Sequence, residues 1–174
     1  MDELLRRPLE PADLQFIQQW LNDEDTYKNL YNLYRPLSLW QLQEWYEKER
    51  DDGAYLCIYH NPNEAVALGM IHYLHPKNRC GEICLIVSPD FRMQGYGSWI
   101  LRDLERFSFC VLNLHKLFFH TASYNPTMSS LALKLGYLQE GLYRKELYYN
   151  GSYHDILRFG KLYEEFFTSK DGQT

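Results

Sequence analysis

The stretch that decides the fold is Arg92-Met93-Gln94-Gly95-Tyr96-Gly97, which separates an apolar run ending at Val87 from a long amphipathic pattern. Glycines let a backbone approach a ligand closely because they carry no Cβ. The first N–H groups of a helix have no partners within it, and with the helix dipole they favour an anion. A strand, a glycine turn and a helix therefore predict a pyrophosphate site, although an ordinary glycine-rich turn has the same pattern.

Two other phosphate-binding motifs fit this turn less well. A dinucleotide-binding fingerprint needs a third glycine three residues after the second, and Ile100 stands at that position. A Walker loop needs Gly-Lys-Ser/Thr, which this turn does not contain.

The elements around the turn predict one mixed α/β domain spanning residues 1–174. Strands are predicted from apolar runs bounded by turn residues, after an opening strand, at 54–60, 66–74, 82–87, 116–123, 138–148 and 153–162. Helices are predicted from caps and apolar periodicity at 11–21, 38–51, 126–135 and along the stripe Ile100, Leu104, Phe107, Val111 and Leu114. Asn150-Gly151 is the strongest hairpin signal. The stretch from Asp23 to Pro36 is predicted as a loop, with room for a short helical turn.

Composition excludes several classes of function. The net charge of −5 argues against a nucleic-acid partner, because phosphate backbones attract basic surfaces. No apolar run is long enough for a membrane span and no signal sequence is present, so we expect a cytoplasmic protein. The cysteines form no zinc or CxxC spacing and are expected to be free, buried thiols, with no metal bound: Cys57, Cys80, Cys84 and Cys110. The tail at about 168–174 is expected to be disordered.

Two motifs of the chain resemble those of the GNAT superfamily of N-acetyltransferases. Arg92, Gly95 and Gly97 match its Arg/Gln-x-x-Gly-x-Gly/Ala signature, and Asn125 with Gly136-Tyr137 matches a second motif around a short helix. Two groups within the superfamily are most similar. The segments 108–116 and 150–155 resemble bacterial spermidine N-acetyltransferases, and 130–136 resembles the N-terminal acetyltransferases of ribosomal proteins.

The resemblance implies a mostly antiparallel central sheet, flanked by helices, in which strands 82–87 and 116–123 splay apart. Acetyl-CoA is expected in that gap as cosubstrate, with its pantetheine pairing to backbone near Leu85 and Val87. The acceptor is expected from the opposite side, between the first two helices and the 148–153 hairpin. The residues expected to bind the cofactor are Leu85, Val87, Arg92, Gln94, Gly95, Tyr96, Gly97, Ser98 and Asn125.

The reaction is the direct attack of a neutral amine on a thioester. An alkyl ammonium has a pKa of about 10, so a base must first remove a proton. Glu82, acting through a water, matches an acidic position of the related families, although a salt-bridged strand glutamate is an equal alternative. Backbone N–H groups of the 82–87 strand would stabilise the oxyanion. His120 could face the cleft, but a structural histidine is the favoured interpretation.

The group that would protonate the leaving thiolate is in doubt. Many family members carry a Tyr seven residues after the Asn, and here that position is Ala132. Ser129, Ser130 or Tyr124 could substitute, or the thiolate could leave without an acid.

The predicted activity is acetyl transfer to a primary amine, either a small-molecule amine or polyamine or a protein N-terminus. The alternative is a non-catalytic acyl-CoA-binding or regulatory module. The stretch 34–43 has no acidic residue, which disfavours spermidine, although Asp23-Glu24-Asp25 could partly substitute. The high aromatic content is compatible with a homo-oligomer such as a dimer, but the sequence does not determine the oligomeric state.

Overall fold

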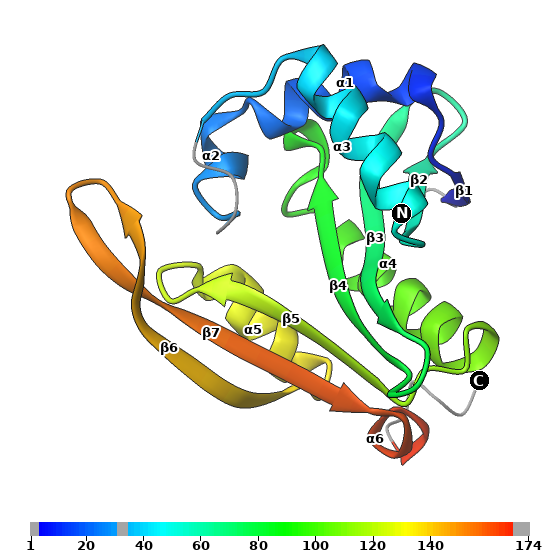
Figure 1. The fold of residues 1–174 in the computed structure, drawn as a ribbon, viewed down its shortest axis with the longest axis vertical. Helices are drawn as coiled ribbons and strands as arrows, with labels where there is room; N and C mark the ends of the chain where they lie inside the picture. Colours follow the sequence, from blue (N-terminus) through cyan, green and yellow to red (C-terminus); the bar gives the residue numbers. More distant parts are fainter. Residues whose placement is uncertain (1–3, 31–34, 169–174) are drawn as a thin grey trace.

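A computed structural model describes residues 4–30 and 35–168. These residues form a seven-stranded sheet in the order β1-β2-β3-β4-β5-β7-β6 (Figure 1). The strands are β1 (Leu5–Pro8), β2 (Tyr55–His60), β3 (Ala65–His75), β4 (Cys80–Val87), β5 (Lys116–Ala122), β6 (Leu138–Tyr149) and β7 (Ser152–Leu162). Every neighbouring pair is antiparallel except β4 and β5. The predicted mixed, mostly antiparallel sheet is therefore confirmed.

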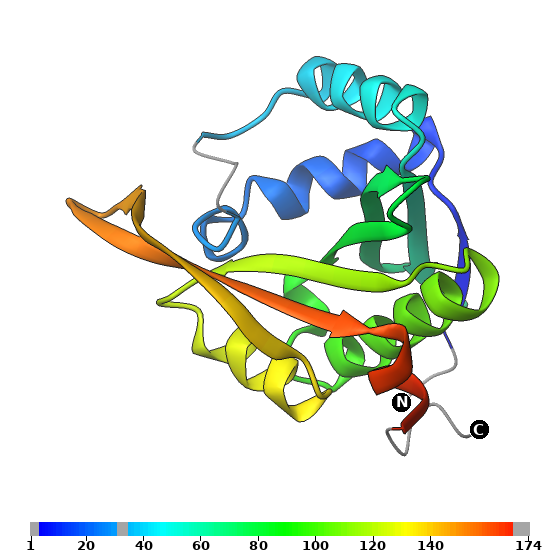
Figure 2. The same ribbon diagram turned by 60° about the horizontal axis from the view of Figure 1, so that its bottom comes forward.

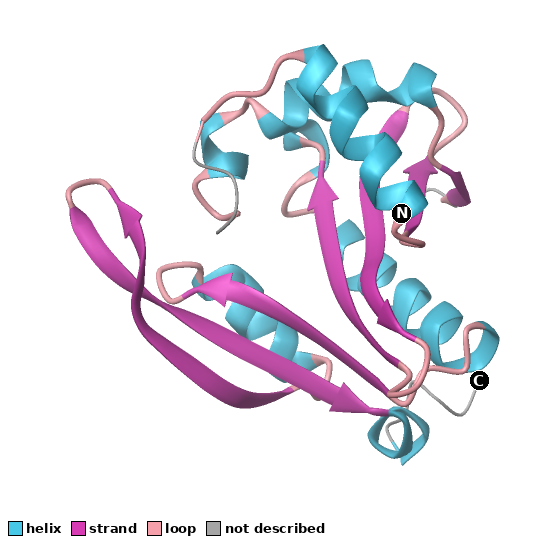
Figure 3. Ribbon diagram, viewed as in Figure 1, coloured by secondary structure: helices cyan, strands magenta, loops and turns pink. Residues whose placement is uncertain are grey.

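Helices cover both faces of the sheet, as Figures 2 and 3 show. They are α1 (Leu14–Leu21), α2 (Glu24–Tyr27), α3 (Leu39–Asp51), α4 (Tyr96–Arg106), α5 (Pro126–Lys134) and α6 (Tyr163–Thr168). One core joins α1 and α3 to β2, β3 and β4, and the other joins α4, α5 and α6 to the opposite face. The helices α1 and α3 contribute to the first core only, so they cover β2–β4 and leave the same face of β5–β7 outside that core.

Several elements begin or end at local sequence signals. Ser38 and Gln41 form the predicted capping box at the start of α3. The Asn125 side chain accepts from the Met128 N–H and begins α5. Gly136 follows this helix with a φ of 81°, a left-handed conformation that glycine adopts without a steric penalty. These caps work through neighbours in sequence, which is why the sequence predicts them.

The long helix after the glycine turn is shorter than its apolar stripe predicts. α4 ends at Arg106 and continues as one π-helical turn, Phe107–Val111, in which Leu112 donates to the Phe107 carbonyl. A π turn is wider than an α turn and breaks the 3.6-residue period. Val111 is consequently 66% exposed, while Phe109 is buried in its place. The prediction that Val111 belongs to the apolar stripe was wrong.

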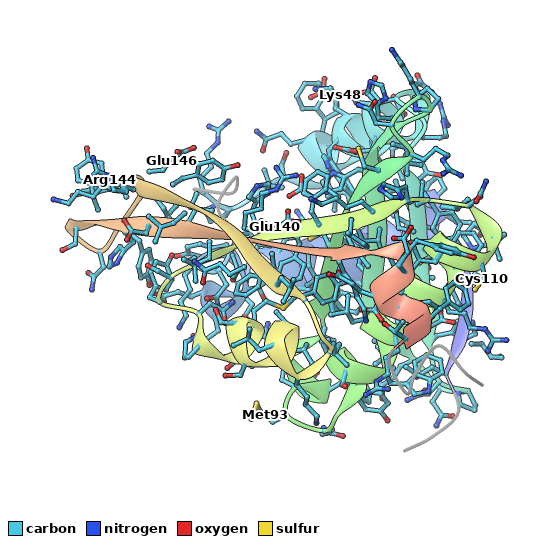
Figure 4. All side chains as sticks on the ribbon, turned by 90° about the horizontal axis from the view of Figure 1, so that it is seen from below. Lys48, Met93, Cys110, Glu140, Arg144 and Glu146 are labelled. Atoms are coloured by element: carbon cyan, nitrogen blue, oxygen red, sulfur yellow. The ribbon has the colours of Figure 1, made fainter. Side chains whose placement is uncertain are left out.

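Other predictions need smaller corrections. Asp23 caps the short helix α2, so the predicted loop contains the anticipated helical turn. All four cysteines are free, but only Cys57 is buried: Cys80 and Cys84 are half-buried and Cys110 is exposed (Figure 4). Thr168 ends α6, and the rest of the predicted disordered tail, residues 169–174, lies outside the described residues. Among the described residues, every helix is too short or too polar to cross a membrane.

Candidate active site

The candidate site begins where β4 and β5 part. These two strands pair in parallel only from Cys80 opposite Lys116 to Glu82 opposite Phe118. Beyond that point they diverge, which Figure 1 shows as a V between the two arrows. The predicted splay is confirmed. In the described structure no strand pairs with the β5-facing edge of β4 from Ile83 to Val87, so this edge offers backbone groups to an extended ligand.

A cleft of about 580 Å³ occupies this gap. Its walls come from β4, β5, the glycine turn, α2 with the residues after it, and α5. Side chains of β4 alternate between the two cores, because successive residues of a strand point to opposite faces. Leu85 and Val87 therefore pack toward the α4 and α5 side, whereas Cys84 and Ile86 pack toward α1 and α3.

One end of the cleft is the glycine turn. Gly95 has a φ of 89° and is the N-cap of α4, and Gly95, Gly97 and Ser98 all line the cleft. A Cβ added at Gly97 would meet only Leu131 and Val87, both at 3.9 Å. The backbone of Gly97 is therefore open on the side that lines the cleft. The first N–H groups of α4 thus border the cavity at the positive end of the helix dipole.

Two predicted cofactor residues turn their side chains away from this end. The Gln94 amide donates to the Asp90 carbonyl at 2.8 Å. The Tyr96 ring is buried against Phe91, with ring centroids 5.6 Å apart. Neither side chain lines the cleft, so only the backbone of these residues is placed to contribute. Met93, which directly precedes Gln94 in the sequence, has a side chain that is 91% exposed (Figure 4).

Arg92 connects the turn to α2. Its guanidinium donates to Asp23 Oδ2 at 2.9 Å and to the Thr26 hydroxyl, and its Nε donates to the Val87 carbonyl at 3.4 Å. Arg92 lines the cleft, but its charge is balanced by Asp23. Arg92 therefore holds α2 in position through Asp23 and Thr26. The glycine motif alone does not predict this role.

A buried glutamate and a half-buried histidine form a pair at the apex of the V. Glu82, the third residue of β4, accepts a hydrogen bond from His120 Nδ1 of β5 at 2.7 Å, and both side chains line the cleft. His72 lies directly opposite Glu82 on β3 and also lines the cleft. An ionised Glu82 accepts only, so it requires the Nδ1–H form of His120. The spacing of Glu82 and His120 in sequence, 38 residues apart, gives no signal of this contact.

The residues considered as proton donors to the thiolate lie in different places. Asn125 lines the cleft, as do Met128 and Leu131 of α5, but Ser129 and Ser130 do not. The Ser129 hydroxyl donates to the Asn125 carbonyl at 3.2 Å, and Ser130 is exposed. Ala132 is fully buried in the core. Tyr124 does not line this cleft either, although its hydroxyl donates to the carbonyl of Lys28, which does.

This placement leads to a prediction for α5. Ser129→Ala and Ser130→Ala should each keep turnover within about threefold of the wild type, because neither hydroxyl lines the cleft. Steady-state thiol release at saturating acetyl-CoA measures it. A loss of a hundredfold in either variant, with cofactor affinity intact, would instead identify that serine as the acid.

The family model described as the acetyltransferase (GNAT) domain matches residues 3–138. The chain belongs to the GNAT acetyltransferase family. It is thus an enzyme of an acyltransferase family, and the predicted resemblance is confirmed. Within residues 4–30 and 35–168, no group of three or more His, Cys, Asp or Glu side chains could hold a metal ion.

Individual relatives agree with this assignment. The chain is 30% identical over 162 residues to a spermidine N(1)-acetyltransferase of Vibrio cholerae, covering 90% of this chain and 91% of the relative. It is 31% identical over 99 residues to the Bacillus subtilis protein YdaF, whose name refers to ribosomal N-acetylation, covering 56% and 54%. The crystal structure of Vibrio cholerae spermidine N-acetyltransferase with CoA and spermine superposes with a TM-score of 0.87 at 26% identity, covering 94% and 97%.

Proposed function

We propose that this GNAT enzyme transfers the acetyl group of acetyl-CoA to a small-molecule primary amine in the cleft between β4 and β5. The observation that carries the proposal is the combination of an unpaired β4 edge with a glycine-capped helix start in one cavity. A pantetheine chain fits the first feature and a pyrophosphate fits the second. The relatives named for spermidine acetylation support a small amine as acceptor rather than a peptide N-terminus.

Each part of the cleft then has a role. The β4 edge near Leu85 and Val87 holds the pantetheine by backbone pairing, and its N–H groups stabilise the negative charge that develops on the thioester oxygen. The amides of Tyr96, Gly97 and Ser98 bind the pyrophosphate. Glu82, oriented by His120, removes a proton from the acceptor ammonium through a water.

The thiolate leaves without a dedicated acid in this proposal. A thiol has a pKa near 8.5, so its thiolate is a tolerable leaving group near neutral pH. The buried Ala132 offers no hydroxyl.

We place the reaction in the cytoplasm, where free thiols such as Cys110 persist. Exposed aromatic side chains such as Trp40 and Tyr153 support a homodimer.

The experiment that tests the cofactor site compares Gly97→Asp with Gly97→Ala. A Cβ fits at this position, so both variants should fold. The aspartate adds a negative charge beside the bound pyrophosphate and should weaken acetyl-CoA binding about 100-fold, whereas the alanine should weaken it less than about tenfold. Calorimetric titration with acetyl-CoA measures both. Equal affinities in the aspartate variant and the wild type would remove the pyrophosphate from this turn.

A further inference from the structure

A second cavity, of about 390 Å³, lies beside the tip of the β6–β7 hairpin. It is lined by Lys28, Tyr124, Tyr149, Asn150, Ser152 and His154. The turn at its rim is rigidly specified, because Asn150 and Gly151 have φ values of 48° and 78°, the left-handed pair of a tight hairpin turn. We name these six residues the hairpin cavity.

Three rings form the wall of the hairpin cavity. Tyr124 stacks on Tyr149 with ring centroids 5.4 Å apart, and His154 meets the Tyr124 ring edge-on at 4.7 Å. The Tyr124 hydroxyl also donates to the Lys28 carbonyl, which fixes the ring against the chain that follows α2. A preassembled aromatic wall of this kind favours a flat, apolar group by stacking and burial.

The hairpin cavity adjoins the catalytic cleft. Lys28 lines both cavities, and Figure 1 places α2 between the hairpin tip and β4. Tyr124 follows His120 by four residues, and the last two lie in the turn after β5, so the two residues are at most roughly 13 Å apart. An amine held near Glu82 and His120 would therefore reach the rings with a tail no longer than that.

Charge decides which tail fits. None of the six residues of the hairpin cavity is acidic, and its one lysine, Lys28, is paired with Asp25. Three acids on the acceptor side are engaged within the chain: Asp23 with Arg92, Asp25 with Lys28, and Glu82 with His120. A second or third ammonium of a polyamine would meet ring faces there but no carboxylate, so the hairpin cavity offers it no charge partner.

We propose that the hairpin cavity binds the far end of the acceptor, and that the acceptor is a primary amine with one positive charge and an aromatic tail. This inference rests on the proposed acetyl transfer in the adjoining cleft. It gives the chain a different acceptor class from the one that the names of its spermidine-acetylating relatives state.

The test compares two acceptors of equal length, spermidine and an unbranched alkylamine ending in a phenyl ring. Thiol release with the wild type should give a kcat/KM at least about tenfold higher for the phenyl compound. Tyr149→Ala should lower that value about 10–100-fold, mainly through KM, since one lost ring contact with its buried area corresponds to about 1.4–2.7 kcal/mol. A short alkylamine that cannot reach the rings should be unaffected.

Tyr148→Ala is the matched control. Tyr148 is the neighbouring tyrosine on β6, is 61% exposed and pairs with Tyr153 rather than lining the cavity. It should leave both kcat/KM values within about twofold. Lys28→Glu should improve spermidine relative to the phenyl compound, because it puts a carboxylate at the cavity. A wild-type preference for spermidine, or equal effects of Tyr148→Ala and Tyr149→Ala, would overturn the inference.

Failure of the subsite and failure of the proposed function can be distinguished. If no amine releases thiol, the proposed acetyl transfer fails. In that case, calorimetric titration with the phenyl compound still shows whether the hairpin cavity binds it. The titration is done on the wild type and on Tyr149→Ala, both with CoA present. Binding lost only in Tyr149→Ala supports it, and binding that is absent or unchanged by Tyr149→Ala refutes it.

Discussion

Replacing Glu82 by glutamine should lower kcat about 10²–10⁴-fold, the range that a general base contributes. Glutamine keeps the size of the side chain and can still accept from His120 Nδ1, so the cleft should retain its shape. It cannot take a proton from the acceptor ammonium. The acidic limb of the kcat pH profile should therefore flatten. Acetyl-CoA affinity should stay within about threefold.

Two histidine variants separate the roles at this apex. His120→Gln removes the ring that orients Glu82 but leaves a donor, and it should lower kcat less than Glu82→Gln does. His72→Gln is the matched control, because His72 also lines the cleft and lies opposite Glu82, yet its ring nitrogen lies 3.7 Å from Glu49. It should change kcat only a few-fold. A Glu82→Gln variant with unchanged rate and pH profile would move the base elsewhere or to solvent.

Lys161→Met should destabilise the fold by about 3–5 kcal/mol, the usual cost of removing one partner from a buried ion pair. The Lys161 and Glu105 side chains are each 1% exposed, and their charged groups lie 3.2 Å apart. Lys161 Nζ also donates to the Leu135 carbonyl at 2.7 Å, at the C-terminal end of α5. Burial raises the pKa of Glu105, and the Lys161 ammonium opposes that rise. Removing Lys161 leaves the carboxyl buried without its cation.

Urea denaturation followed by circular dichroism measures this loss. The double variant Lys161→Met/Glu105→Leu should recover most of it, since removing both charges leaves no uncompensated carboxyl. If Lys161→Met does not fold, recovery in the double variant still decides the point. A single variant within about 1 kcal/mol of the wild type, or a double variant no more stable than the single one, would contradict the prediction.

The candidate site was predictable where it depends on contiguous residues. The run Arg92 to Gly97 contains the whole helix start, and Gly95 adopts the positive φ that its type suggests. The Glu82–His120 pair was not predictable as a unit, because two strands far apart in sequence bring it together. From the sequence, Glu82 was expected as the base and His120 as a structural residue. The acceptor was expected beside the 148–153 hairpin, which contains Tyr149, but His154 and Lys28 were not expected to line a cavity.

The sequence by itself determined the caps, the turns and the order of strands and helices, because those depend on interactions between near neighbours in the chain. Only the tertiary structure decided that Arg92 pairs with Asp23, that Val111 faces solvent and that Ser129 misses the cleft. The short parallel pairing of β4 with β5 likewise brings Glu82 and His120 into contact, and the divergence of the strands beyond it opens the space beside them. Such contacts depend on how elements pack against each other, and packing joins residues that no local pattern links.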